Sequence, residues 1–129
     1  MSYLLVTNNS LCYETYKDRY ELCYLPDASY LEILRQARDF IHQGYLLITH
    51  PISGSLKPNQ TPYRTVVLAK ESMEDKVPCQ DILQIESSIE SCEKFLKQRD
   101  LPEWPEDIKH DFKTLDLSFV KGALEKVSF

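Results

Sequence analysis

The sequence predicts a single α/β domain: a small three-layer sandwich with a mainly parallel four-stranded sheet, onto which a helical C-terminal segment, residues 101–129, packs. At 129 residues the chain has the length of one ordinary domain. Short apolar runs alternate along it with longer amphipathic patterns. A helical pattern between two apolar runs, joined by short connections, is typical of the β-α-β crossovers that build parallel sheets.

The first part of the chain predicts two strands with a short helix between them. Residues 3–6 are an apolar run that ends at Thr7, and the Asn and Ser residues that follow are strong N-caps. We therefore expect a short helix over residues 11–18. Residues 20–25 carry apolar side chains on both faces and form the second predicted strand, which ends at Pro26.

The clearest helical pattern covers residues 29–43. Ser29 and Glu32 have the spacing of a capping box, in which each side chain satisfies a backbone N–H of the first turn. Gly44 follows at the position where helices commonly end with a residue of positive φ. Residues 45–49 form the third predicted strand. The apolar face of the helix is made by Leu31, Ile33, Leu34, Ala37, Phe40 and Ile41.

The second half predicts one more strand and three helices. Residues 65–69 are β-branched and apolar, as in a buried strand. A long helix over residues 78–97 begins with a proline in its first turn. After a break that contains two prolines, we expect a short helix over residues 106–112 and a last helix capped by Asp116. The apolar stripe of the long helix is Ile82, Ile85, Ile89, Cys92 and Leu96.

Composition and charge narrow the function classes. Hydrophobic residues make up 43% of the chain and charged residues 27%, as in globular proteins. Twenty acidic residues against 15 Lys and Arg give a net charge of −5, which does not favour general binding to nucleic acid or anionic membranes. The apolar runs are far shorter than the ~20 residues that span a bilayer, and no signal-peptide pattern opens the chain. We expect a cytoplasmic protein without nucleic-acid or membrane partners.

The cysteines predict neither a metal site nor a redox pair. Their positions, 12, 23, 79 and 92, lack the spacing of zinc ligands or of a Cys-x-x-Cys motif. Cys23 and Cys92 fall on apolar periodic positions. We interpret all four as free, non-catalytic thiols of a reducing compartment, and we expect no metal and no cofactor.

The stretch that most suggests function is residues 46–64, a short apolar run followed by a long loop. Prolines and Gly54 predict a shaped backbone in this loop, which also carries hydroxyls, a His, a Lys and an Arg. Loops of this length in a compact domain are more often functional than idle.

The loops after the first and third predicted strands would lie at one edge of a parallel sheet, where ligands commonly bind. If these strands are neighbours, both loops line one crevice, and a helix N-terminus after Ser10 favours anions there. We expect a small anion such as a phosphate or a carboxylate. The predicted ligand-binding residues are Thr7, Asn8, Asn9, Ser10, Thr49, His50, Ser53, Gly54, Ser55, Lys57, Asn59, Thr61, Tyr63 and Arg64.

Each part of this site has a structural alternative. Asn8 and Asn9 suit caps and turns as well as they suit a ligand. Residues 53–55 form either an anion-binding nest or a tight turn. His50 acts either as a general acid or base or by donating one hydrogen bond that holds the loop, and we favour the structural role. Of the two cations, Arg64 is a better candidate than Lys57.

The sequence contains no complete catalytic set. It has no nucleotide-binding glycine motif, no Gly-x-Ser-x-Gly elbow and no isolated pair of acids. A non-catalytic binding protein is therefore the favoured interpretation. The alternative is a small enzyme that uses His50 as acid or base on an anionic small molecule held by Arg64 and Lys57.

Three segments resemble the GrdX family. They are Thr7-Asn8-Asn9, the helical segment Arg38-Asp39-Phe40-Ile41-His42 and, above all, the string THPISGSLKPNQTPYR at residues 49–64. This string is too long and too unusual in composition to match by chance. The resemblance extends from Leu4 to about Leu96, whereas residues 101–129 carry no motif that continues it.

The resemblance implies a context rather than a reaction. The family is similar to an accessory protein encoded with the glycine, sarcosine and betaine reductases of amino-acid-fermenting anaerobes. Beside the small anion expected from the loops, it makes a reductase subunit the second candidate partner, and it implies an anaerobic cytoplasm that agrees with reduced thiols. It carries over no catalytic residue, and it leaves homo-oligomerisation open.

Overall fold

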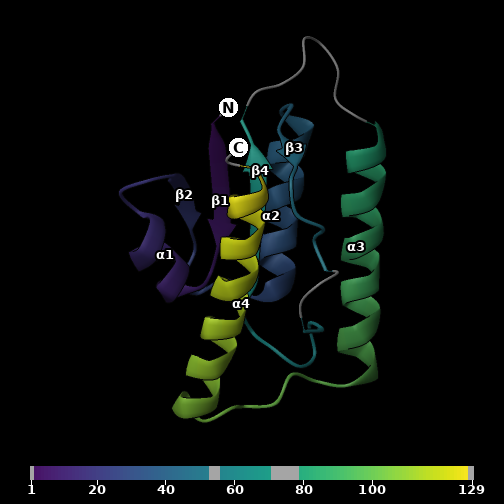
Figure 1. The fold of residues 1–129 in the computed structure, drawn as a ribbon. Helices are drawn as coiled ribbons and strands as arrows, with labels where there is room; N and C mark the ends of the chain where they lie inside the picture. Colours follow the sequence, from purple (N-terminus) through teal and green to yellow (C-terminus); the bar gives the residue numbers. More distant parts are fainter. Residues whose placement is uncertain (1, 53–55, 71–78, 128–129) are drawn as a thin grey trace.

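The computed structural model describes residues 2–52, 56–70 and 79–127, and Figure 1 shows strands and helices alternating over most of this chain. The strands are β1 (Tyr3–Thr7), β2 (Glu21–Tyr24), β3 (Leu46–Leu47) and β4 (Thr65–Ala69). The helices are α1 (Ser10–Tyr16), α2 (Tyr30–His42), α3 (Cys79–Gln98) and α4 (Glu106–Val127). The α/β class predicted from the sequence is confirmed, whereas the start predicted for α3 at Pro78 lies outside the described residues.

The four-stranded sheet is mixed, and the prediction of a mainly parallel sheet was wrong. Its strand order is β2-β1-β4-β3, with β1 parallel to β2 and antiparallel to β4, and β3 antiparallel to β4. The loop between β3 and β4 contains no described helix. A parallel partner ordinarily requires a crossover, usually helical, that carries the chain back along the sheet, so β4 pairs antiparallel to β3 instead.

Both faces of the sheet are covered by helices. The side chains of Leu4, Val6 and Leu68 face one way, into a core built with α2 and α3. Those of Leu5 and Val67 face the other way, into a core built with α1 and α4. This division follows from the alternation of side chains along a strand. Figure 1 shows α4 crossing one face of the sheet while α2 and α3 lie beyond the other.

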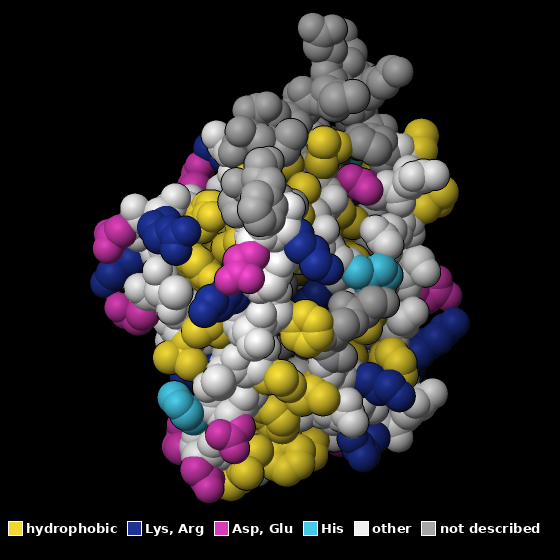
Figure 2. Space-filling view, viewed as in Figure 1, with side chains coloured by type: hydrophobic (Ala, Val, Ile, Leu, Met, Phe, Trp, Pro, Cys, Tyr) yellow, Lys and Arg dark blue, Asp and Glu magenta, His cyan; other side chains and the backbone are white. Residues whose placement is uncertain are grey.

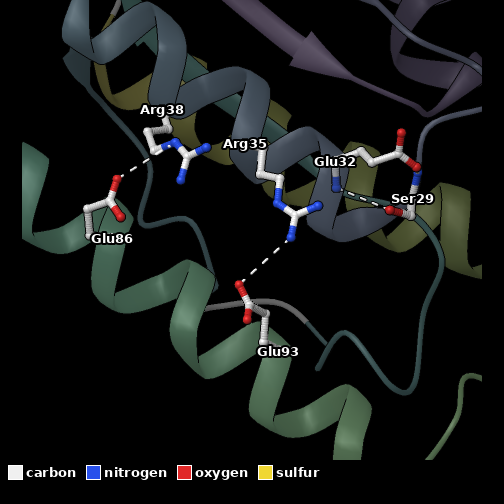
Figure 3. Close-up of polar contacts among 6 residues, drawn as sticks. All are labelled: Ser29, Glu32, Arg35, Arg38, Glu86 and Glu93. Carbon is white, nitrogen blue, oxygen red and sulfur yellow. Dashed lines mark hydrogen bonds and ion pairs between the residues drawn. The ribbon is translucent and has the colours of Figure 1, made fainter.

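Helix α2 has the ends that the sequence predicts. Ser29 and Glu32 form the complete capping box, and Gly44 takes a φ of 108° after the helix. On its outer side Arg35 lies 3.9 Å from Glu93, and Arg38 lies 3.7 Å from Glu86 (Figure 3). These side chains are largely exposed, so each pair contributes less than about 1 kcal/mol and mainly helps to align α2 with α3.

Helix α4 is continuous where the sequence predicts two helices. Asp116 does not cap a last helix: it lies in the interior of α4 and is 3% exposed. No proline or glycine separates residues 112 and 116, so nothing interrupts the backbone hydrogen bonds there. The carboxylate of Asp116 instead finds its partners in β4 and in the turn before α1.

Candidate functional site

A bulge at the end of β3 shapes the site. The backbone N–H groups of Ile48 and Thr49 both donate to the carbonyl of Val67, at 3.0 and 3.4 Å. Thr49 Oγ1 accepts the N–H of Val67 at 3.0 Å, in place of a backbone carbonyl. Ile48 and Thr49 thus oppose the single residue Val67. This bulge ends the hydrogen-bond ladder between β3 and β4 and turns the following residues away from the sheet. The strand predicted over residues 45–49 is therefore shortened to Leu46–Leu47.

Arg64, which immediately precedes β4, is a buried arginine without a carboxylate partner in the described part of the chain. Its residue is 2% exposed, and its guanidinium donates to the carbonyl oxygen of His50. Its Nε has no hydrogen-bond partner among the described residues. None of the ion pairs formed by those residues includes Arg64. An uncompensated buried charge is costly, so this guanidinium calls for an anion.

The charge of Arg64 acts on neighbouring titratable groups. Burial lowers the pKa of His50, and the Arg64 cation lowers it further. Burial raises the pKa of Tyr30 to about 12, against an opposing effect of Arg64. The Tyr30 hydroxyl is also buried without a hydrogen-bond partner in the described residues. The lowered pKa of His50 agrees with a positive potential around Arg64, which for Tyr30 offsets only part of the effect of burial.

Arg64 lines an open cavity of about 470 Å³, here called the Arg64 cavity. The cavity lies between α4 and the adjoining ends of β3 and β4. Figure 2 shows the face that carries α4, with hydrophobic side chains in yellow among basic ones in dark blue. The residues lining the cavity are Ile48, Thr49, His50, Arg64, Thr65, Leu115, Ser118, Phe119, Val120, Gly122, Ala123 and Lys126.

His50 has a structural bond at one ring nitrogen. Its Nδ1 accepts the N–H of Ile52 at 3.0 Å, whereas the sequence analysis had the imidazole donating the bond that holds the loop. In the neutral ring the proton then resides on Nε2. An acid–base role at Nδ1 would require breaking this turn, so the geometry favours the structural function for that nitrogen. The side chain is exposed and also borders a second hollow of about 550 Å³ against α3.

Thr7 and Asn9 belong to a buried network rather than to the cavity. Thr7 Oγ1 lies 2.6 Å from Thr65 Oγ1, which lies 2.7 Å from Asp116 Oδ2. Asn9 caps α1 through the N–H of Leu11, and its Nδ2 donates to Asp116 Oδ2 at 3.0 Å. Asp116 Oδ1 accepts the backbone N–H of Thr65 at 3.2 Å. Asn9 therefore caps α1 with its oxygen, while its Nδ2 binds α4 through Asp116 and the Lys113 carbonyl.

Asn8 connects three segments by its side chain. Its Nδ2 donates to the carbonyls of Ala28 and Pro62 at 2.9 and 2.8 Å. Its Oδ1 accepts the backbone N–H of Arg64 at 2.9 Å. The amide therefore has both donor hydrogens and its oxygen engaged, and Asn8 does not line the Arg64 cavity. β1 and β3 are separated by β4, yet Asn8 and His50 are both bound to Arg64 at one end of the sheet.

The rest of the predicted site divides between other places. Lys57 stacks over the ring of Phe95 with its Nζ 5.2 Å from the centroid, and Asn59 Nδ2 donates to the carbonyl of Phe95. Thr61 Oγ1 accepts the N–H of Tyr63, whose ring lies under Lys113. None of these lines the Arg64 cavity, and Ser10 is simply the first residue of α1. Predicted ligand residues Ser53, Gly54 and Ser55 lie outside the described residues.

The sequence analysis missed the wall that α4 contributes to the cavity. Leu115, Phe119 and Ala123 recur at helical spacing of four, and Leu115 and Phe119 are 43% and 39% exposed. This row runs beside Leu117, Val120 and Leu124, which pack into the core shared with α1. The second apolar row on this helix was the sequence signal for the cavity wall, because a helix that packs against the core on one face needs only one apolar stripe.

The described cysteines are all free, as predicted. Cys12 and Cys92 are buried, Cys23 is intermediate and Cys79 is exposed. Burial raises the pKa of both Cys12 and Cys92 to about 12, and for Cys12 the Asp116 carboxylate adds to this effect. Among the described residues no cluster of His, Cys, Asp or Glu could hold a metal ion.

We expect Cys79 to react with an aromatic disulfide reagent far faster than Cys12 or Cys92 in the folded protein. At pH 8 a thiol with a pKa of about 12 is ionised in roughly one molecule in ten thousand, and the thiolate is the reacting form. Absorbance at stopped-flow times should show one fast thiol, which Cys79→Ser removes. A fast phase that survives this substitution, or fewer than four thiols in denatured, unreduced protein, would contradict the assignment.

Comparison with protein families identifies one match. The family model described as GrdX-like protein matches residues 4–125, which includes α4 as well as the segments quoted above. No match was found among curated proteins or among solved structures. Within the described chain, no helix combines the length and the apolar character needed to cross a membrane. Because the family model spans nearly the whole chain, this protein belongs to the GrdX-like family.

Proposed function

We propose that this protein is a non-catalytic accessory protein of glycine, sarcosine or betaine reductase metabolism that binds a small anion in the Arg64 cavity. The metabolic context rests on the family. The binding function rests on one observation: a buried arginine, Arg64, without a described carboxylate partner, lines a cavity of about 470 Å³. A cavity of this size lies within the ~300–1,000 Å³ range of small-molecule sites.

The chemistry available to an anion comes from two kinds of donor. One amino group of Arg64 donates to the His50 carbonyl, and the charge of the guanidinium is not neutralised within the described residues. Thr49 also lines the cavity, and since its oxygen accepts the Val67 N–H, its own hydroxyl proton is left to donate. Lys126 adds a second, exposed cation. None of the described residues that line the cavity is acidic.

The same arrangement favours binding over catalysis. His50 has Nδ1 engaged by the Ile52 N–H, and its lowered pKa keeps the ring neutral near pH 7. A catalytic role would need a partner that moves a proton at a reacting atom, and the lining residues supply a cation and hydroxyls. In the accessory interpretation the protein carries or senses the anion, and a reductase subunit is its proposed partner in an anaerobic cytoplasm.

The test replaces Arg64 with Met, which keeps most of the side-chain volume and removes the charge. We expect the free energy of unfolding without ligand to stay level or to rise by up to about 2 kcal/mol, because an uncompensated buried charge is lost. We expect anion affinity to fall about ten- to a hundredfold, the value of a charge-assisted hydrogen bond. Thermal denaturation would be followed with phosphate, sulfate, acetate, glycine and betaine at matched ionic strength.

Arg99→Met is the matched control, because Arg99 also donates to a loop carbonyl, that of Asn59, yet lies outside the cavity. Stabilisation of the wild type and of Arg99→Met, but not of Arg64→Met, supports the site. Arg64→Lys provides a second variant that keeps the charge with fewer donors. If no anion stabilises the wild type, the anion site is refuted and binding of a reductase component becomes the better interpretation.

A further inference from the structure

The described residues that line the Arg64 cavity combine apolar side chains with one buried cation, Arg64. Ile48 lies on the strand side, and Leu115, Phe119 and Ala123 form a row along α4. Arg64 is the buried charge, whereas Lys126 and His50 are exposed residues. A fully hydrated inorganic ion would make no use of these apolar walls. A ligand that combines one anionic group with an apolar body would cover both surfaces.

The volume of the cavity also favours a ligand with an apolar body. A water molecule takes up about 30 Å³ of liquid volume, and a bare phosphate or acetate is only a few times larger. Most of a cavity of about 470 Å³ would then remain filled with water against apolar side chains. An apolar body of several carbons would displace that water, which is the favourable part of hydrophobic binding.

The charges of the lining residues narrow the class of ligand further. The described residues that line the cavity include no Asp or Glu, whereas they include two cations, Arg64 and Lys126. An ammonium group on the ligand would meet cations and no carboxylate, so a zwitterionic amino acid is disfavoured. One amino group of Arg64 already donates to the His50 carbonyl, and the remaining guanidinium donors with the Thr49 hydroxyl are sufficient for one carboxylate.

We propose that the Arg64 cavity selects an aliphatic or aromatic monocarboxylate without an amino group, its carboxylate on Arg64 and its apolar body against Ile48 and the α4 row. This specificity rests on the anion binding proposed above and deepens it. It sets free amino acids aside as ligands and points to deaminated acids of several carbons.

Gly122 provides a variant that tests the apolar part alone. It lies on α4 at the cavity, and a Cβ added there would meet no atom within 4 Å. A Cβ at this position therefore fits without a clash, and Gly122→Leu places a larger apolar side chain at the cavity. Gly122→Ala is its control: it adds one methyl group and favours the helix, so its melting temperature should rise. Neither substitution touches Arg64.

Calorimetric titration with acetate, butyrate and hexanoate would measure the dependence on chain length. We expect the affinity of the wild type to rise roughly fourfold for each methylene that enters the cavity. Gly122→Leu should lose most of this rise while keeping its acetate affinity, and Arg64→Met should weaken every member of the series. Hexanoate should bind at least tenfold more tightly than 6-aminohexanoate or than uncharged hexanamide.

The outcomes separate this inference from the proposed function. Carboxylates that bind through Arg64 with the same affinity at every chain length would overturn the apolar selection and leave the anion site standing. Equal binding of hexanoate and 6-aminohexanoate would overturn the selection against amines. Equal affinity of hexanoate for the wild type and Gly122→Leu would place the apolar body elsewhere. Absence of binding by all the carboxylates would overturn both proposals.

Discussion

Replacing Asp116 with alanine should lower the free energy of unfolding by about 3 kcal/mol. The carboxylate is 3% exposed and accepts the backbone N–H of Thr65, the Thr65 hydroxyl and the Asn9 amide. A truncated side chain leaves the Thr65 N–H buried without a partner, which costs about 1–3 kcal/mol, and it removes the other charge-assisted bonds as well. Urea denaturation followed by tryptophan fluorescence would measure the change.

Asp111→Ala is the matched control for this prediction. Asp111 lies on the same helix, α4, but is exposed. A surface substitution of this kind should change stability by no more than about 0.5 kcal/mol. A loss below about 1 kcal/mol for Asp116→Ala would show that Asp116 does not hold α4 against β4 and the turn before α1.

Replacing Asn8 with alanine should lower the free energy of unfolding by about 2–3 kcal/mol. Its amide joins Ala28, Pro62 and Arg64 by three hydrogen bonds within 2.9 Å, and the residue is 4% exposed. Without it the backbone N–H of Arg64 is left buried and unpaired. Chemical denaturation of the variant measures this loss directly.

The prediction for Asn8 decides between a ligand-binding and a structural role. Gln98→Ala, which removes an exposed amide at the end of α3, is the control and should be nearly neutral. A ligand-binding Asn8 would instead show nearly full stability together with a loss of anion affinity. That result would contradict the contacts described here, in which every polar atom of the amide serves the fold.

Local sequence patterns determined the helices α2 and α3 and singled out the loop that contains Arg64. The capping box of Ser29 and Glu32 and the positive φ of Gly44 depend on residues three or fewer positions apart, so sequence alone predicts them. The unusual composition of the loop before β4 also singled out Arg64, which lines the cavity. The family resemblance rests on that same loop.

The order of the strands and the division of the predicted site were decided by contacts between distant parts of the chain. Placing β4 between β1 and β3 depends on pairing across the sheet, which no local pattern contains. Asn9 binds Asp116 across 107 positions, and Asn8 binds Arg64 across 56. The sequence shows that these side chains are polar, but burial obliges each one to find a specific partner.

Polar residues of the loop therefore looked alike in the sequence and were separated only by folding. Asn59 binds a backbone carbonyl of α3, Asn8 binds the backbone of Arg64, and Arg64 lines a cavity that α4 completes. The sequence by itself determined which side chains could bind an anion. The tertiary structure decided which of these side chains keep a donor for a ligand, because a hydrogen bond already made inside the fold removes that donor from any ligand.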